Sequence, residues 1–258
     1  MFFKTIDFSK FSSIRVGQPT EVLMLERGDK IPKDRVIIGH ANNLLISPTP
    51  PPLMRLSKDF SFIELDNDWL TIGCATPTGK IVSFAKKNNL GGFEFISKLP
   101  GSLGGMIAMN AGVKSYEIFN ILDSIKIDGR WIKKENIEYR YRFAKLGGVA
   151  TEARFRVKKG FDKSLLDELK AFRSNQPKTP SAGSAFKNPD GDYAGRLIEA
   201  VGLKGISRGA MQWSEVHANF LVNHGGGTFQ EAKYLIDLAK KRVFEKFGIE
   251  LKEEVQVL

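Results

Sequence analysis

Short apolar runs alternate with turn residues over the first third of the chain. Runs of this length, bounded by turn residues, are typical of β-strands. The pattern predicts strands at 21–25, 35–38, 61–65 and 69–72. The proline cluster at 48–52 offers almost no backbone N–H groups to a ladder, so we expect a loop or extended edge there, separating two small β-rich units.

The middle of the chain should contain one helix and further strands. Thr76-Pro77 is typical of a helix start, an N-cap followed by proline in the first turn, and this helix should end near 88–89. Further on, Asp128-Gly129 predicts a hairpin turn, and 149–157 alternates like a strand. Lys158-Lys159-Gly160 is the expected boundary before the last third.

The last third contains the clearest helical pattern of the chain. A capping box of Thr228 and Glu231 opens it, and Gly248 should end it as the C′ glycine. Its apolar face is expected at positions 232, 235, 236, 239 and 243. A shorter helix is expected over 161–174 and a strand over 249–258.

Composition excludes several classes of protein. The 258 residues are 42% hydrophobic and 26% charged, the balance of a soluble protein with a sizeable core. No apolar run approaches the roughly 20 residues that span a bilayer, and the first residues lack the pattern of a signal peptide, so a cytoplasmic protein is expected. The single cysteine, Cys74, excludes an internal disulfide, and with three histidines it cannot complete the usual zinc sets, so no metal site is expected.

The formal net charge of +10 lies almost entirely in the first two thirds of the chain. No more than three basic residues are consecutive, at Lys240-Lys241-Arg242, and the others are interleaved with acidic ones. This distribution argues against a dedicated nucleic-acid binder and is compatible with small anionic ligands.

The stretch 99–112 is the most informative part of the sequence. Three glycines within five residues, Gly101, Gly104 and Gly105, lead into an apolar helix-like run. Glycines let backbone N–H groups approach an anion, which suggests a pyrophosphate cradle. A tight turn or close helix packing would explain the same glycines, and the stretch is neither a G-x-G-x-x-G fingerprint nor a Walker A loop.

Other motifs follow one another in a fixed order along nearly the whole chain. They lie at 11–17, 38–45, 181–189, 194–199, 202–205 and 217–223. Together with 99–112, they resemble the motifs of the UDP-N-acetylenolpyruvoylglucosamine reductase family, in which 38–45 and 99–112 match the flavin-binding segments. In the first of these the family usually has Gly-Ser-Asn or Gly-Thr-Asn where this chain has Ala41-Asn42-Asn43.

The resemblance implies an α+β protein. A two-part FAD-binding region of vanillyl-alcohol-oxidase (PCMH) type would occupy 1–56 and 57–160, and an α/β substrate-binding domain would occupy 161–258. It implies FAD as cofactor and NADPH as reductant, with hydride passing to the enolpyruvyl group of a UDP-sugar in peptidoglycan precursor synthesis. The implied cofactor contacts are Gly39, Asn43, Leu44, Pro100, Gly101, Ser102, Gly104, Gly105, Asn110 and Gly112.

Ser184 aligns with the family's proton donor, although beside Gly183 it would ordinarily be interpreted as a turn or cap serine. Asn188, with Lys187, is implied as a substrate contact, against the ordinary interpretation of an Asn-Pro turn. His217 is expected among the substrate contacts or as a structural histidine. His40 and His224 are given no role, and Cys74 is expected in the core.

The resemblance also implies a catalytic arginine and a catalytic acid. Arg140 aligns with the arginine that polarises the substrate carboxylate, but Arg142 stands where the family has serine. On a strand the two arginines would face the same way and either could be a surface charge. Glu254 aligns with the family's acid, whereas strand alternation alone would select Glu253 as the unusual residue.

Only 44 positions separate Arg140 from Ser184, so the chain resembles the compact class of the family, which lacks a tyrosine-bearing loop. The expected partner is a small UDP-sugar, with no nucleic acid and no membrane, and a monomer is favoured. Another FAD-dependent oxidoreductase of the same fold is the first alternative. A nucleotide- or RNA-binding module, suggested by the charge, is the second.

Overall fold

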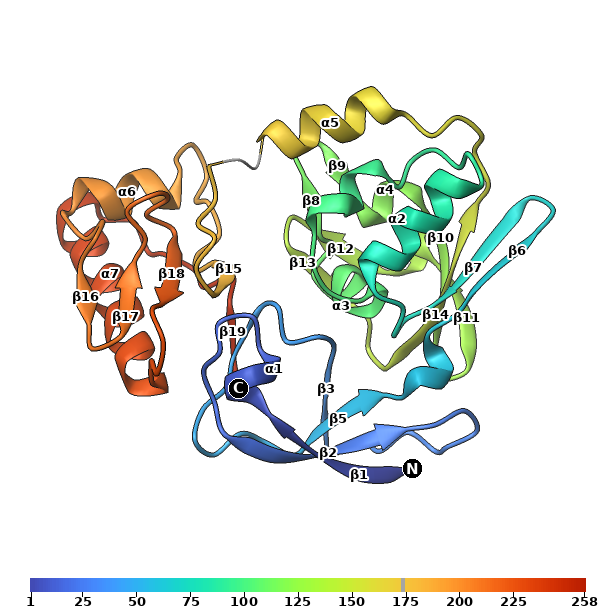
Figure 1. Cartoon of the computed structure of the whole chain (residues 1–258), viewed down its shortest axis with the longest axis horizontal. Helices are drawn as coiled ribbons and strands as arrows, with labels where there is room; N and C mark the ends of the chain where they lie inside the picture. The colour runs from blue at the N-terminus through green and yellow to red at the C-terminus, as the bar shows by residue number, and fades with distance from the viewer. Residues whose placement is uncertain (173–174) are drawn as a thin grey trace. The chain divides into compact units, whose positions relative to one another are not determined.

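The structure is a computed structural model that describes residues 1–172 and 175–258 (Figure 1). The chain divides into two compact units. Unit 1 combines Met1–Lys4, Val22–His40 and Pro52–Ser174, and unit 2 combines Thr5–Glu21, Ala41–Pro51 and Asn175–Leu258. Each unit is therefore assembled from distant parts of the sequence, and the expected limits at 56 and 160 stay a prediction.

The N-terminal sheet has the order β1-β2-β5-β3 and confirms the strands expected at 21–25 and 35–38. Its strands are β1 (Phe2–Asp7), β2 (Pro19–Leu25), β5 (Leu53–Leu56) and β3 (Val36–Ile38). Both β2 and β3 run parallel to β5. The proline cluster before β5 forms no strand, as expected from its missing donors.

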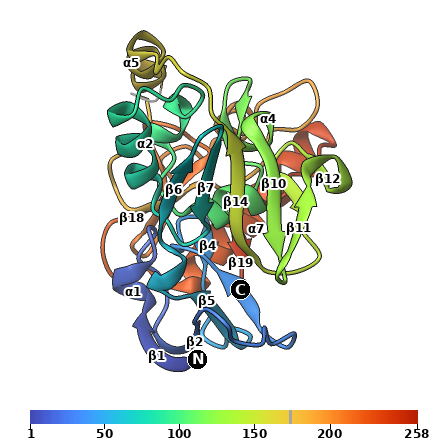
Figure 2. The ribbon, with the colours of Figure 1, turned by 90° about the vertical axis from the view of Figure 1, so that its right-hand side faces the viewer.

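The second sheet of unit 1 has five strands, which Figure 2 shows side by side in the order β6-β7-β14-β10-β11. They are β6 (Ile63–Asp66), β7 (Trp69–Gly73), β14 (Ala150–Arg156), β10 (Leu122–Ile127) and β11 (Arg130–Lys133). All neighbours are antiparallel. The hairpin between β10 and β11 turns at Asp128-Gly129, both with positive φ, which confirms the predicted turn.

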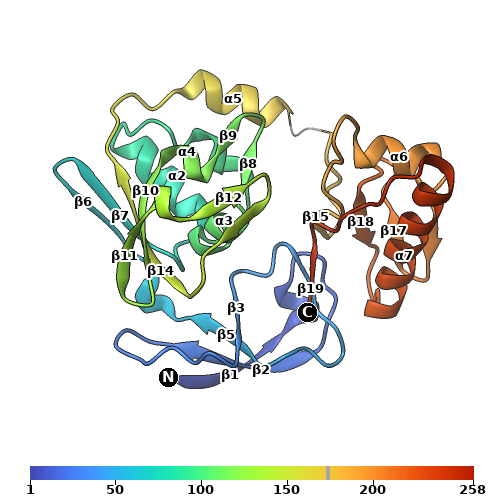
Figure 3. The same ribbon diagram turned by 180° about the vertical axis from the view of Figure 1, so that it is seen from behind.

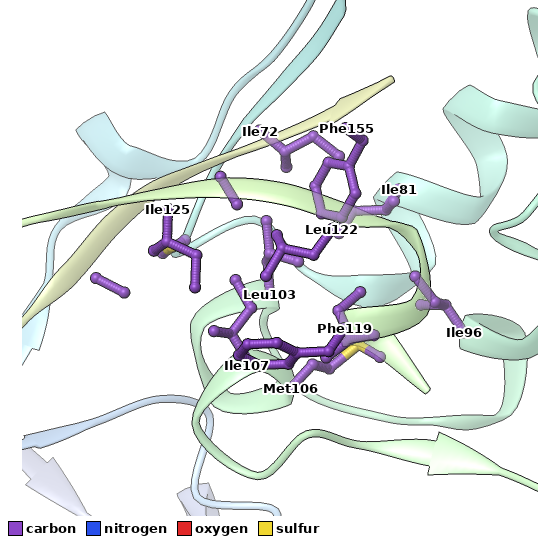
Figure 4. Close-up of a cluster of buried hydrophobic side chains, with 14 of the residues drawn as sticks. Ile72, Ile81, Ile96, Leu103, Met106, Ile107, Phe119, Leu122, Ile125 and Phe155 are labelled. Carbon is purple, nitrogen blue, oxygen red and sulfur yellow. The ribbon is translucent and has the colours of Figure 1, made fainter. Parts of the chain in front are cut away.

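Helices α2 (Thr78–Lys87), α3 (Leu103–Ala108) and α4 (Ile118–Ile121) belong to the same unit as this sheet. Figure 4 shows Leu103, Met106 and Ile107 of α3 pointing into a buried cluster with Phe119 and Phe155. The unit's remaining elements are β8 (Gly112–Val113), β9 (Tyr116–Glu117), β12 (Glu138–Arg140), β13 (Phe143–Lys145), α5 (Lys163–Phe172) and three 3₁₀ turns at Lys58–Phe60, Glu94–Lys98 and Lys134–Asn136. Packing of α3 against the sheet fixes the start of that helix.

The predicted start of α2 is wrong by one residue. Pro77, not Thr76, is the N-cap, and it makes no side-chain capping bond. Thr76 is fully buried, and its hydroxyl donates to the Phe62 carbonyl at 3.0 Å. The Thr76 hydroxyl therefore bonds to a residue distant in sequence instead of capping the helix, as the local pattern predicts. The expected helix over 161–174 is α5, and its last two expected positions lie outside the described residues.

Unit 2 contains an antiparallel sheet in the order β15-β18-β17-β16, with α6 (Ala194–Ala200) and α7 (Phe229–Phe247) (Figure 3). Its strands are β15 (Ser181–Ser184), β18 (Phe220–Asn223), β17 (Met211–Trp213) and β16 (Ser207–Arg208). The short helix α1 (Phe8–Phe11) and the parallel pair β4 (Leu44–Leu45) and β19 (Gln256–Val257) complete it.

Helix α7 confirms its prediction in full. The capping box of Thr228 and Glu231 is formed, the five expected apolar positions are buried, and Gly248 ends the helix with φ of 67°. The strand expected over 249–258 is mostly wrong, because only β19 is a strand. In this segment the backbone N–H groups of Glu254 and Gln256 donate to Ala185 and Asn43, two separate parts of the chain, so different partners hold it along its length.

Candidate active site

A small pocket of about 90 Å³ lies in unit 1. The loop after β3 contributes Gly39 and His40, β5 contributes Arg55, and the start of α3 contributes Ser102, Gly104 and Gly105. Four of the predicted cofactor contacts, which are Gly39, Ser102, Gly104 and Gly105, are therefore brought together around one cavity.

The glycines of this pocket have different physical roles. A Cβ on Gly39 would lie 2.9 Å from Ser102 Oγ, so a side chain there would clash with Ser102 in the pocket wall. A Cβ on Gly104 would lie 3.2 Å from both Cβ and the carbonyl oxygen of Cys74, which makes its close packing the reason for glycine. At Gly105 the nearest atom would be 3.7 Å away, so its backbone stays accessible from one side.

Two backbone donors at the start of α3 already have partners inside the protein. The N–H of Leu103 donates to Thr76 at 3.0 Å, and that of Gly104 donates to Cys74 at 2.8 Å. Before them, Gly101 has φ of 136°, which favours glycine, and its carbonyl accepts from Thr78. With only six residues in α3, the backbone alone is a weaker anion cradle than the sequence suggested. Pro100 lies directly before this turn.

Asn110 and Gly112 shape the loop that follows α3. Asn110 is fully buried, and its amide group donates to Glu117 Oε2 at 2.7 Å and accepts from the Phe119 N–H at 3.3 Å. A Cβ on Gly112 would lie 2.1 Å from the Tyr116 carbonyl oxygen, so the β8–β9 pair requires glycine. These contacts give both residues structural roles, and their cofactor contacts stay predictions.

In unit 2, residues 41–45 of the first predicted flavin-binding segment are tied to the end of the chain. Asn43 Nδ2 donates to the Glu254 carbonyl at 2.9 Å, and the Asn43 carbonyl accepts from the Gln256 N–H at 2.9 Å. Leu44 is buried in β4. Ala41 has φ of 51°, which is a left-handed conformation that glycine adopts easily. The family that the motifs resemble usually has glycine at this position. The loop thus keeps its turn without that glycine.

Ser184 and Glu254 are brought together by the backbone of unit 2. Ser184 ends β15, paired with Phe220, and the Glu254 N–H donates to the carbonyl of the next residue, Ala185, at 2.8 Å. The neighbouring Glu253 makes an ion pair with Lys240 at 3.1 Å. Glu253 is therefore engaged by Lys240, and the role of Glu254 as the acid stays a prediction.

The two candidate arginines do not share a strand, so the expectation that they face the same way is wrong. Arg140 ends β12, whereas Arg142 lies in the tight turn before β13 with φ of 54°. Arg142 donates to the Gly112 carbonyl at 3.0 Å and so holds a loop. The Arg140 side chain is 69% exposed and contacts Glu138 at 3.4 Å. Arg140 is thus the more accessible guanidinium of the two.

The predicted substrate contacts of unit 2 also hold local structure. Asn188 Oδ1 accepts from the Ala194 N–H at 3.1 Å, where α6 begins, and the Lys187 N–H donates to the Lys252 carbonyl at 2.9 Å. His217 Nδ1 accepts from the Asn219 N–H at 3.2 Å, and burial lowers the pKa of His217. These contacts favour the structural interpretation of His217.

Sequence reasoning missed Arg55 and His40 as pocket residues. Burial lowers the pKa of Arg55, and burial together with the positive charge of Arg55 lowers that of His40. The sequence did offer a signal for Arg55, because it is a charged residue among the apolar residues of β5, directly after the proline cluster. Cys74 is a buried core residue as expected, and burial raises the pKa of its thiol. Among the described residues, no group of acidic, histidine or cysteine side chains suits a metal ion.

Comparison with known proteins identifies the family. Residues 176–258 match the family model described as the C-terminal domain of UDP-N-acetylenolpyruvoylglucosamine reductase. The reductase of Helicobacter hepaticus is 48% identical, covering 98% of both chains, and that of Campylobacter jejuni strain RM1221 is 48% identical, covering 98% of this chain and 99% of the relative. The chain belongs to the UDP-N-acetylenolpyruvoylglucosamine reductase family.

The crystal structure of the UDP-N-acetylenolpyruvylglucosamine reductase of Thermus caldophilus has the same fold. The Thermus chain is 30% identical to this one in sequence, and the two structures superpose with a TM-score of 0.86. The match covers 100% of this chain and 99% of the Thermus chain. This match and the mixed helices and strands confirm the α+β class and the recognised family. Neither alternative function receives support from these relatives.

Proposed function

We propose that this member of the reductase family reduces the enolpyruvyl group of UDP-N-acetylglucosamine enolpyruvate to UDP-N-acetylmuramate, using NADPH and a bound FAD, in peptidoglycan precursor synthesis. The observation that carries the proposal is 48% identity over 98% of the chain to relatives named for this reductase. A cytoplasmic location, a small UDP-sugar as partner and a monomeric state belong to the same proposal. No described helix is long and apolar enough to cross a membrane.

The residues of the unit 1 pocket fit part of FAD. About 90 Å³ is well below the roughly 300 Å³ of a site that encloses a whole small molecule, so this pocket suits a fragment such as the diphosphate. A wider cleft of about 1310 Å³ shares four lining residues with it, so a longer ligand can extend from one into the other. The shared residues are Ile37, Leu56, Leu146 and Gly148. We assign this region to the FAD-binding part of the PCMH type.

FAD supplies hydride chemistry when it is bound. The chain's own residues must then bind the substrate carboxylate and deliver a proton to the carbon next to it. The exposed Arg140 guanidinium contacts Glu138 at 3.4 Å and lies 4.4 Å from the centre of the Phe143 ring. As a planar charged group at the surface it suits carboxylate binding. We assign the proton to the Ser184 hydroxyl and a supporting acidic role to Glu254, whose backbone is bonded to Ala185.

Replacement of Ser184 tests the proposal. Ser184→Ala should leave reduction of the flavin by NADPH unchanged and slow reoxidation by the enolpyruvyl sugar by about 10² to 10⁴-fold, because the proton donor is lost. Stopped-flow absorbance of the flavin separates the two half-reactions. Ser181→Ala, on the same strand, is the matched control and should keep both rates.

Rapid sugar-dependent reoxidation in Ser184→Ala would remove this serine from the proton-donor role. A wild-type protein that consumes NADPH without needing the enolpyruvyl sugar would contradict the proposed reaction itself and favour another oxidoreductase of the same fold.

A further inference from the structure

The pairing of β15 with β18 is irregular just before Ser184. The paired residues are Ser181 with Val222 and Ser184 with Phe220, so the register shifts between the two pairs. Gly183 lies within this irregularity and has φ of 81°, a left-handed conformation that favours glycine. The strand then ends at Ser184. Strand pairing alone therefore does not determine the path of the chain around this serine.

A buried asparagine holds the two residues that follow Ser184. Asn219 lies directly before β18 and is 2% exposed. Its side chain accepts from the Phe186 N–H at 3.0 Å and donates to the Phe186 carbonyl at 2.8 Å. Its backbone carbonyl accepts from the Ala185 N–H at 2.8 Å. Asn219 therefore takes the place of a strand partner beyond the end of β15.

The same two residues also contact the end of the chain and the core of unit 2. The Ala185 carbonyl accepts from the Glu254 N–H at 2.8 Å. The Phe186 ring is fully buried and stacks on Trp213, with ring centroids 6.0 Å apart. This segment is therefore fixed by several partners, and the peptide backbone passes the constraint to Ser184.

We propose that Asn219 is a positioning residue for the Ser184 hydroxyl, which it aligns for proton delivery by bonding to the peptide groups that follow this serine. The inference rests on the proposed function, because it concerns the proposed proton donor. Both polar atoms of the Asn219 side chain are bonded to Phe186, so Asn219 acts through the backbone. Alignment matters here because a serine hydroxyl is a weak acid, and a displacement of about 1 Å costs about 10²-fold in rate.

Stopped-flow measurement of both half-reactions tests this role. Asn219→Ala should leave reduction of the flavin by NADPH unchanged and slow reoxidation at saturating enolpyruvyl sugar by about 10- to 100-fold. The sugar concentration that gives half the maximal rate should change by less than about threefold, because the lost bonds are to the backbone and not to the sugar. Adding Asn219→Ala to Ser184→Ala should slow reoxidation no further, because Asn219 acts only through that hydroxyl.

Asn223→Ala is the matched control. Asn223 lies on β18 and is also 2% exposed. Its side chain bonds to backbone groups of Ile14, Arg15, Gly225 and Gly227, none of which belongs to the Ser184 segment. Asn223→Ala should lower stability to urea at least as much as Asn219→Ala, because it loses as many buried hydrogen bonds. Both of its half-reaction rates should stay within about threefold of wild type.

Wild-type reoxidation in Asn219→Ala, equal slowing in Asn223→Ala, or further slowing in the double variant would overturn the inference. If Asn219→Ala does not fold, Asn219→Ser decides the question, because its shorter side chain cannot bond to both groups of Phe186. Asn219→Ser should slow reoxidation about tenfold, and a wild-type rate there would count against the role. Rapid reoxidation in Ser184→Ala alone would instead contradict the proposed proton donor, and Asn219 would then have no hydroxyl to align.

Discussion

Residues that the family motifs mark as ligand contacts also hold the backbone of this protein. Asn43, Asn110 and Asn188 each bond to a backbone group of another residue, at sequence separations of 211, 9 and 6 positions. An asparagine amide both donates and accepts, so it can replace missing backbone partners in a loop. A motif residue can therefore be required for the shape of the site as much as for a ligand.

The adjacent carboxylates at 253 and 254 should behave differently. Glu254→Gln should lower turnover by about 10²-fold or more, because we assign it a role in proton transfer. Glu253→Gln should keep turnover and cost at most about 1 kcal/mol, because it loses only the partly exposed pair with Lys240. Steady-state kinetics and urea unfolding of both variants check this. The opposite pattern would assign the acid to Glu253.

Several site residues could be predicted from sequence because a motif of consecutive residues keeps its neighbours together. The residues around the pocket at Gly39, Ser102 and Gly105 are of this kind. Arg55 could not, because it lies outside every motif and enters the pocket only through the pairing of β5 with β3. The orientation of Arg142 could not be predicted either, since it depends on a positive φ in a non-glycine residue.

At the scale of elements, helix α7 was predictable because its start, apolar face and end are all local features. Its capping bonds join residues three apart, and its buried face repeats with the helical period. Residues 249–258 were not predictable in the same way. That segment bonds to Ala185 and Lys187 and to the loop at Asn43, so tertiary partners decide its conformation.

The capping box of α7 should contribute measurably to stability. Thr228→Ala removes the hydroxyl that accepts from the Glu231 N–H, and should lower the free energy of unfolding by about 1 kcal/mol. Urea denaturation followed by circular dichroism measures the change. Gln230→Ala, which leaves the capping box intact, should stay within about 0.5 kcal/mol of wild type. Equal losses in the two variants would show that the box contributes nothing specific.

For the whole molecule, assembly of each unit from separate chain segments links the proposed cofactor site to global stability. The unit 1 pocket takes residues from segments around 39, 55, 104 and 148, which are dispersed when the chain unfolds. A ligand that needs all of them binds the native state alone, and binding then shifts the unfolding equilibrium.

FAD should therefore raise the melting temperature of the apoprotein. At a free concentration 100 times its dissociation constant, stabilisation should be about 2.7 kcal/mol. Differential scanning calorimetry with increasing FAD measures the shift, and riboflavin, which lacks the diphosphate, should stabilise much less at equal concentration. Equal shifts with FAD and riboflavin would mean that the diphosphate does not contribute to binding.

By itself, the sequence determined the α+β class, the family, the helix α7, the hairpin at Asp128-Gly129 and the motif residues that the pocket brings together. These features depend on local hydrogen bonds, periodic burial or consecutive residues. The tertiary structure alone decided that Arg55 joins His40, that Glu253 pairs with Lys240, and that the last ten residues are mostly not a strand. Those outcomes depend on contacts between residues far apart in the chain, which no local pattern encodes.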